Sequence, residues 1–229
     1  MTDVRDSALE KLEFQERFDA RLAAIDELER FDAKHGVETS VPMEGWEMEE
    51  ASDATLENNS RYSPTPVRTI RQVIAASPVP HGDMSFVDFG CGKGRVMLVA
   101  SDFPFKKIIG VEFSGSLCET ARNNFSRYKS DAQRCHDFEV HCQDVSEFAI
   151  PDEAGFFYFY EPFTAQIAEK VLDNIEASIA RHPRRAILSF VGKALNSLLE
   201  RRPFWKQVGA TLPSPDDPWY DARLYSNIA

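Results

Sequence analysis

Residues 86–96 read FVDFGCGKGRV, an apolar run with one acid, then a glycine at every second position, then an apolar run. Glycines are needed where the backbone turns sharply against a ligand, because a Cβ would occupy the volume of that ligand. An apolar run before such glycines is typical of a buried strand, and the run after them is typical of a helix. The stretch therefore predicts a strand, a ligand-binding turn and a helix, in that order.

Strand and helix patterns alternate on both sides of this turn. We expect strands at 85–89, 107–112, 138–142, 155–160 and 186–191, and helices at 67–76, 94–101, 116–128 and 165–180. The tail, 204–208 and 219–225, can supply a closing antiparallel pair. Such alternation predicts an α/β fold with a mostly parallel sheet and helices on both faces.

The N-terminal part reads differently, and we divide the chain into an extension, 1–60, and a catalytic domain, 61–229. Apolar residues recur at three- and four-residue steps over 8–34, which predicts one amphipathic helix that ends at Gly36. Its apolar stripe either packs on the same chain, the interpretation we favour, or binds a second copy in a homodimer or another partner. The acidic, aperiodic segment 37–60 is interpreted as a loop or lid.

Asp88 distinguishes between two kinds of ligand for the glycine turn. Dinucleotide sites place a pyrophosphate on the helix N-terminus with G-x-G-x-x-G spacing, and a carboxylate there would repel it. Here the spacing is G-x-G-x-G and the acid is present. S-adenosylmethionine has no phosphate and carries an ammonium and a sulfonium group, so the acid favours that cationic cofactor and makes a dinucleotide oxidoreductase the least favoured alternative.

Two further acids stand at the ends of the next two expected strands. Glu112 lies eighteen residues beyond Gly94, where a carboxylate can hold a ribose diol. Asp144 follows the third strand and can accept a hydrogen bond from the adenine amine, with Phe113 and Val145 beside the ring. The carboxyl ends of parallel strands meet at one sheet edge, so we expect the three acids there together.

This set of motifs resembles the class I S-adenosylmethionine-dependent methyltransferases. The resemblance implies a three-layer Rossmann-like sandwich with a seven-stranded, mostly parallel sheet whose last strand is antiparallel. It implies S-adenosylmethionine as cofactor and S-adenosylhomocysteine as product, and the 62–66 segment is similar to an elbow that touches the methionine end of the cofactor. The cofactor-binding residues expected on this basis are Tyr62, Thr65, Asp88, Gly90, Cys91, Gly92, Gly94, Glu112, Phe113, Asp144 and Val145.

The methyl acceptor is expected beyond the fourth strand, which ends Tyr160-Glu161-Pro162-Phe163. This end resembles the Asn/Asp-Pro-Pro-Tyr/Phe motif of amino-methyltransferases, but it has Glu for Asn or Asp and a single proline. Glu161 is the candidate to orient or deprotonate an ammonium acceptor, and the rings of Tyr160 and Phe163 are candidates to stabilise the transferring charge. In the alternative interpretation, Phe163 is a core residue and Glu161 an acid near a helix N-terminus.

Composition limits the remaining possibilities. The formal charge of -11 makes nucleic acid an improbable partner and favours a cationic acceptor. We find no apolar run of membrane-spanning length and no secretion signal, so we expect no membrane partner and a cytoplasmic location. Reduced cysteines follow from that location. If residues 135–142 form a strand, alternation separates Cys135 and His141 from His136 and Cys142, so we expect no metal site there.

The sequence thus predicts a methyltransferase that acts on an amine nitrogen, of a small molecule or of a protein lysine. The 88–96 stretch resembles, more faintly, a lysine-methylating branch of the family. The alternatives are an O- or C-methyltransferase of a small metabolite, although the metal ligands of the catechol type are missing, and a non-catalytic S-adenosylmethionine-binding module. The identity of the methyl acceptor is unknown.

Overall fold

A computed structural model describes residues 16–26, 30–43, 61–160, 164–192, 195–215 and 220–228. Their centre is a seven-stranded sheet in the order β3-β2-β1-β4-β5-β7-β6. The strands are β1 Ser85–Phe89, β2 Ile108–Glu112, β3 Phe138–Cys142, β4 Ala154–Tyr160, β5 Ile187–Val191, β6 Lys206–Pro213 and β7 Asp221–Ser226. Strands β1 to β5 are parallel and β7 is antiparallel to both of its neighbours, which confirms the expected fold class.

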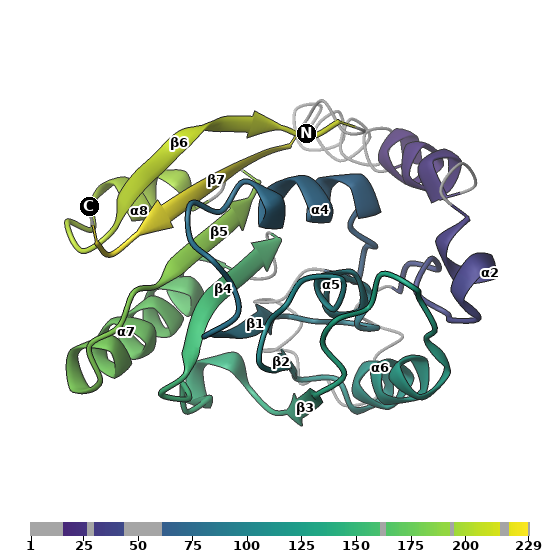
Figure 1. The fold of residues 1–229 in the computed structure, drawn as a ribbon. Coiled ribbons are helices and arrows are strands. Elements are labelled where there is room, and N and C mark those ends of the chain that lie inside the picture. The colour runs from purple at the N-terminus through teal and green to yellow at the C-terminus, as the bar shows by residue number, and fades with distance from the viewer. Residues whose placement is uncertain are drawn as a thin grey trace, which may run out of the picture.

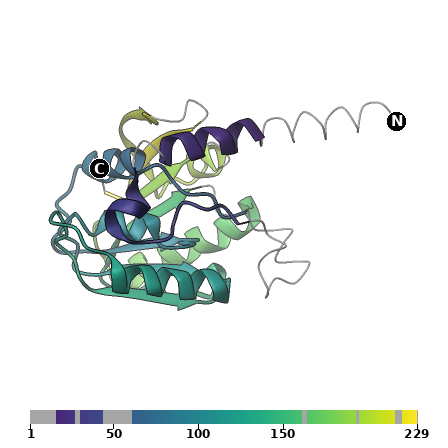
Figure 2. The same ribbon diagram turned by 90° about the vertical axis from the view of Figure 1, so that its right-hand side faces the viewer.

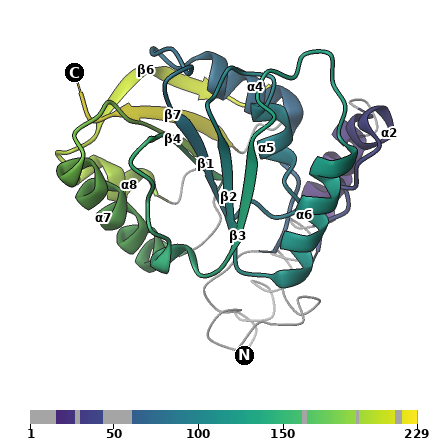
Figure 3. The same ribbon diagram turned by 60° about the horizontal axis from the view of Figure 1, so that its bottom comes forward.

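Helices cover both faces of this sheet, as Figures 1 and 3 show. On one side lie α4 Val67–Ala75, α5 Arg95–Ala100 and α6 Gly115–Arg127, and on the other lie α7 Ala165–Arg181 and α8 Asn196–Glu200. All five residues of β1 are buried, and alternate side chains enter opposite cores: Phe86 joins one cluster and Val87 the other. Burial on both faces explains why the central strands read as continuous apolar runs.

The expected elements agree with the observed ones to within about two residues, with two omissions. Neither α8 nor the short 3-10 helix η2, Val145–Glu147, was predicted, since each is about one turn long and too short to show a period. In addition, β6 extends to Pro213, beyond the expected 204–208.

The single helix expected over 8–34 is wrong for the described residues. Residues 16–26 are helical, but Arg30 has a left-handed backbone (φ 48°) and a second helix, α2 Phe31–His35, follows it. After the bend, the ring of Phe31 packs against those of His35 and Tyr128. Gly36 is confirmed as the C-terminal cap, with φ 70°. Residues 1–15 and 27–29 lie outside the described residues.

The helix 16–26 packs on its own chain in this structure. Phe18 and Leu22 are buried, and the ring of Phe18 meets that of Tyr220 edge-on at 5.8 Å. Figure 2 shows both N-terminal helical segments (purple) against the outside of the domain. A homodimer through this helix remains a prediction, as does the boundary at residue 60. Of the expected acidic loop, 37–43 is described, without regular structure except the bridge of Met43 to Tyr62.

Candidate active site

The turn after β1 has the backbone that its glycines predict. Gly90, Gly92 and Gly94 all have positive φ, at 78°, 51° and 83°. At Gly92 a close approach adds to this requirement, because a Cβ there would lie 2.3 Å from the nearest ring carbon of Tyr62. The loop therefore brings bare backbone to the carboxyl edge of the sheet, with the Tyr62 ring against it.

Glu112, the last residue of β2, is bonded to this loop. Its Oε2 accepts a hydrogen bond from the amide of Gly92 at 3.0 Å, and its Oε1 accepts one from the amide of Ser114, also at 3.0 Å. The side chain is buried, and that burial raises the pKa of Glu112. Glu112 thus holds the shape of the glycine turn, a role that strand-end spacing alone did not reveal.

Asp88 lies beside Glu112 in the middle of the sheet, in register with Gly110 of β2 and Tyr158 of β4. It is only 3% exposed, and its Oδ2 has no hydrogen-bond partner among the described residues. Burial, and then the charge of Glu112, raise the pKa of Asp88 well above its usual range. A buried carboxylate oxygen without a partner is costly, so this position is suited to a group that arrives with hydrogen-bond donors or positive charge.

The two predicted residues of the 62–66 segment, Tyr62 and Thr65, have different surroundings. The Tyr62 hydroxyl donates to the carbonyl of Thr39 at 2.6 Å, and the Lys93 ammonium lies 5.7 Å from the ring centre. Burial raises the pKa of Tyr62 above its usual value. Thr65 is buried and its side chain is hydrogen-bonded to Tyr158. Tyr62 therefore contacts the glycine loop, whereas Thr65 contacts Tyr158, the residue of β4 in register with Asp88.

Asp144 stands at the end of β3, on the same edge. It is exposed, and its Oδ1 accepts a hydrogen bond from the amide of Ser146 at 2.7 Å, which caps η2. Val145 is buried and Phe113 is half-buried. The structure thus brings the three acids to adjacent strand ends, β1, β2 and β3, at one edge of the sheet.

Of the expected acceptor residues, only Tyr160 is described. It ends β4, and its ring lies 5.4 Å from that of Tyr220, which precedes β7. Glu161 and Phe163 lie outside the described residues. Tyr220 was not predicted, because it comes sixty residues later in the sequence and reaches the edge only through the antiparallel return of the chain.

Part of this chain is similar to known proteins. A family model described as "Methyltransferase domain" matches residues 87–161, about a third of the chain, from β1 to the end of β4. This part of the chain is similar to methyltransferase domains. A protein-lysine N-methyltransferase of Saccharolobus islandicus is 34% identical over 94 residues, 39% of this chain and 56% of that relative. The match thus spans little more than half of the relative's length.

Solved methyltransferases share the fold of this domain at low sequence identity. An S-adenosylmethionine-dependent methyltransferase from Aquifex aeolicus is 13% identical with a TM-score of 0.54, covering 71% of this chain and 91% of that one. An RNA methyltransferase from Salinibacter ruber, solved with S-adenosylhomocysteine, is 17% identical with a TM-score of 0.50, covering 71% and 92%. These likenesses concern the fold alone.

Residues 30–43, which we call the strap, lie beside the glycine loop. Arg95, the first residue of α5, is 2% exposed; its guanidinium donates to Thr39 Oγ1 and Ser40 Oγ, each at 2.7 Å, and pairs with Asp26. Asp32 lies 3.7 Å from the same guanidinium. Sequence analysis missed Arg95 because its partners lie 55 to 69 positions away.

A second set of contacts ties the strap to the loop itself. The Asn124 amide of α6 donates to the carbonyls of Glu38 and Lys93, each at 2.9 Å, and its Oδ1 accepts from the Glu38 amide. Lys93 is buried and its ammonium pairs with the Glu38 carboxylate at 3.0 Å. Through Lys93, the glycine loop is therefore tied to both the strap and α6.

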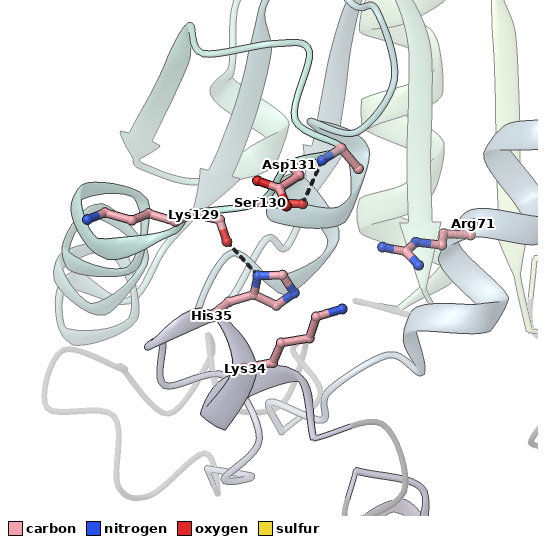
Figure 4. A pocket seen from close by; sticks show the side chains of 7 residues that line it. Lys34, His35, Arg71, Lys129, Ser130 and Asp131 are labelled. Atoms are coloured by element: carbon pink, nitrogen blue, oxygen red, sulfur yellow. Dashed lines mark hydrogen bonds between the residues drawn. The ribbon is translucent and has the colours of Figure 1, made fainter.

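A pocket of about 430 Å³ lies elsewhere, lined by Lys34, His35, Arg71, Lys129, Ser130, Asp131 and Ala132. Figure 4 shows its side chains coming from α2, from α4 and from the segment after α6. That segment follows the C-terminal end of α6, away from the strand ends that carry the acids. Arg71 pairs there with Asp102 at 2.7 Å. This pocket is separate from the candidate active site.

Among the residues that the structure describes, no group of three His, Cys, Asp or Glu side chains could hold a metal ion. Cys135 and His136 precede β3, so the strand alternation expected from 135 onward applies only from Phe138. The described helices also include none with the length and apolar character that a membrane crossing requires.

Proposed function

We propose that the protein is an S-adenosylmethionine-dependent methyltransferase that methylates an amine nitrogen, with protein lysine as the first acceptor class to test. The observation that carries the donor is the buried Asp88 carboxylate, whose Oδ2 has no described partner beside a glycine turn. The matched lysine methyltransferase supports the acceptor class. The net charge of -11 also favours approach of a cationic acceptor.

The residues present fit this cofactor. Asp88 offers its carboxylate to the ammonium group, and a cation placed there would offset the burial that raises the pKa of Asp88. The Glu112 carboxylate accepts hydrogen bonds from backbone amides, and a remaining lone pair is available to a ribose hydroxyl. Asp144 uses Oδ1 as a cap and leaves Oδ2 for the adenine amine.

The cofactor would supply an electrophilic methyl group on a sulfonium. The chain must then hold an uncharged nitrogen in line with that methyl group, because positioning accounts for most of the catalysis of such displacements. Tyr160 and Tyr220 place aromatic rings at the end of β4, where a ring face stabilises positive charge. We propose that Glu161, at the next position, accepts the proton that the amine must lose.

Binding of the donor is tested by titration calorimetry with S-adenosylmethionine, S-adenosylhomocysteine and NAD. We expect the two adenosyl compounds to bind and NAD not to bind. The variant Glu112→Gln should weaken binding, whereas Glu139→Gln, an exposed acid on β3 that pairs with Lys107, should not. Binding of NAD by the wild type, or of no adenosyl compound by a folded protein, would refute the proposal.

Acceptor choice is tested separately with methyl-labelled S-adenosylmethionine. We expect label to enter lysine-containing peptides and to be absent from matched peptides with arginine in place of lysine. Label on hydroxyl or carbon acceptors only would instead support an O- or C-methyltransferase. Donor binding without transfer to any acceptor would support a non-catalytic binding module.

A further inference from the structure

Two cysteines lie beside Glu112 and have no part in the proposed reaction. Cys118 is on the first turn of α6 and is fully buried, whereas Cys142 ends β3 and is exposed. In the sheet, Cys142 is in register with Glu112 of the neighbouring strand β2. A buried thiol and an exposed thiol thus flank the strand end that is proposed to hold the ribose.

The contacts of these thiols converge on one short piece of backbone. The Cys118 thiol donates to the carbonyl of Glu112 at 3.4 Å, and the Cys142 thiol donates to the carbonyl of Phe113 at 3.8 Å. These carbonyls are consecutive, and the two thiols also interact with each other. The other described thiols contact different backbone: Cys135 donates to Asp137 and Cys91 to Gly92.

We propose that Cys118 and Cys142 form an oxidative modification site, at which hydrogen peroxide produces a reversible disulfide between them. The exposed Cys142 thiol reacts first: its sulfur is oxidised to the sulfenic acid and the peroxide is reduced to water. The Cys118 sulfur then attacks that sulfenic acid, the S–S bond forms, and the hydroxyl leaves as a second water molecule. A dithiol reductant reverses the reaction.

The environment of the two thiols sets this order. Burial, and then the neighbouring Cys142 thiol, raise the pKa of Cys118, which keeps that thiol protonated and unreactive toward peroxide in bulk water. The exposed thiol is the accessible one. Cys118 is the resolving thiol, because it lies beside the sulfenic acid and loses its proton as the bond forms.

The disulfide would join the first turn of α6 to the end of β3 and remove both thiol donors from the Glu112 and Phe113 carbonyls. The loss of these hydrogen bonds predicts weaker donor binding in the oxidised protein, a consequence that rests on the proposed function. We expect the affinity for S-adenosylhomocysteine to fall about tenfold. Formation of the bond itself does not depend on the proposed function.

To test this, the full chain is treated with hydrogen peroxide, and its disulfides are mapped by mass spectrometry without reduction. We expect a peptide that links Cys118 to Cys142, lost on treatment with dithiothreitol. It should be absent from Cys142→Ser and from Cys118→Ser and present in Cys135→Ser, the matched buried-cysteine control. Because Cys142 is exposed, the Cys142→Ser protein should fold even if Cys118→Ser does not.

Each outcome bears on the proposal. A Cys142 sulfinic acid without the link, or a link through Cys91 or Cys135, would overturn it. Calorimetry with S-adenosylhomocysteine then compares reduced and oxidised wild type. If the reduced protein binds and the oxidised protein binds equally well, the bond forms without affecting the site and its regulatory consequence is overturned. If the reduced protein does not bind, the proposed function fails while the disulfide stands.

Discussion

Replacing Gly92 by alanine tests whether the glycine turn is shaped by the Tyr62 ring. The new Cβ would lie 2.3 Å and 2.4 Å from two carbons of that ring, more than 1 Å inside ordinary contact, at a backbone φ of 51°. The left-handed conformation costs a non-glycine residue about 1–2 kcal/mol, and overpacking adds about 1–3 kcal/mol. We expect a total loss of about 2–5 kcal/mol in the free energy of unfolding.

The Tyr62 ring cannot swing aside at little cost. Its hydroxyl is held by the Thr39 carbonyl at 2.6 Å, and its backbone exchanges two hydrogen bonds with Met43. The matched control is Gly209→Ala on β6, where φ is 73° but a Cβ would meet nothing within 4 Å. That variant should lose only the conformational cost, about 1–2 kcal/mol.

Urea denaturation of the two alanine variants, in wild type and in a Tyr62→Ala background, measures the difference. In the Tyr62→Ala background the additional cost at Gly92 should disappear, whereas the cost at Gly209 should not change. Equal losses for the two glycine variants, or an additional cost at Gly92 that persists without the ring, would show that Tyr62 does not shape the turn.

Three other substitutions test the remaining contacts. Asp88→Asn should remove the part of the pH dependence of stability that is due to Asp88. Folding raises the pKa of Asp88, so the folded state keeps a proton that the unfolded chain loses above about pH 4. The stability of the wild type therefore falls as the pH rises from about 4 to the raised pKa of the folded state. In thermal melts from pH 4 to 8, the melting temperature of the variant should rise relative to that of the wild type as the pH increases. Melting temperatures that change in parallel would contradict this. Arg95→Ala should cost about 3–5 kcal/mol and speed proteolysis within the strap, while Arg71→Ala, whose pair with Asp102 is exposed on the arginine side, should cost under about 1 kcal/mol. Asp144→Ala should lose the preference for S-adenosylhomocysteine over its 6-hydroxy analogue, by about tenfold in Kd; a preference that is unchanged in calorimetry would remove Asp144 from the site.

The sheet and its three acids were predictable because their signals are local. Burial of the parallel strands on both faces leaves continuous apolar runs, and each run ends where an acid or a glycine follows it. The positive φ of Gly90, Gly92 and Gly94 follows from the same pattern. Strand ends in a parallel sheet share one edge, so spacing along the chain was sufficient to group Asp88, Glu112 and Asp144.

Other features depend on contacts that span long stretches of sequence. Arg95 looks like an ordinary first residue of a helix until Asp26, Thr39 and Ser40 are brought to it. The bend at Arg30 was missed because the apolar period continues through it, whereas the ring of Phe31 packs on Tyr128, which is distant in sequence. The roles of Glu161 and Phe163 stay predictions.

The pairing of Arg95 with the N-terminal segment has a consequence for the order in which the protein can fold during its synthesis. Asp26 is 69 positions before Arg95, so the ribosome releases the acid long before its partner. Until α5 emerges, the N-terminal segment has no guanidinium to close on, and after α5 emerges that closure spans a long loop. Contacts between distant positions are slow to form. We therefore expect the glycine turn to become rigid only after α5 has emerged and the N-terminal segment has closed on it, although the residues of the turn are neighbours in sequence.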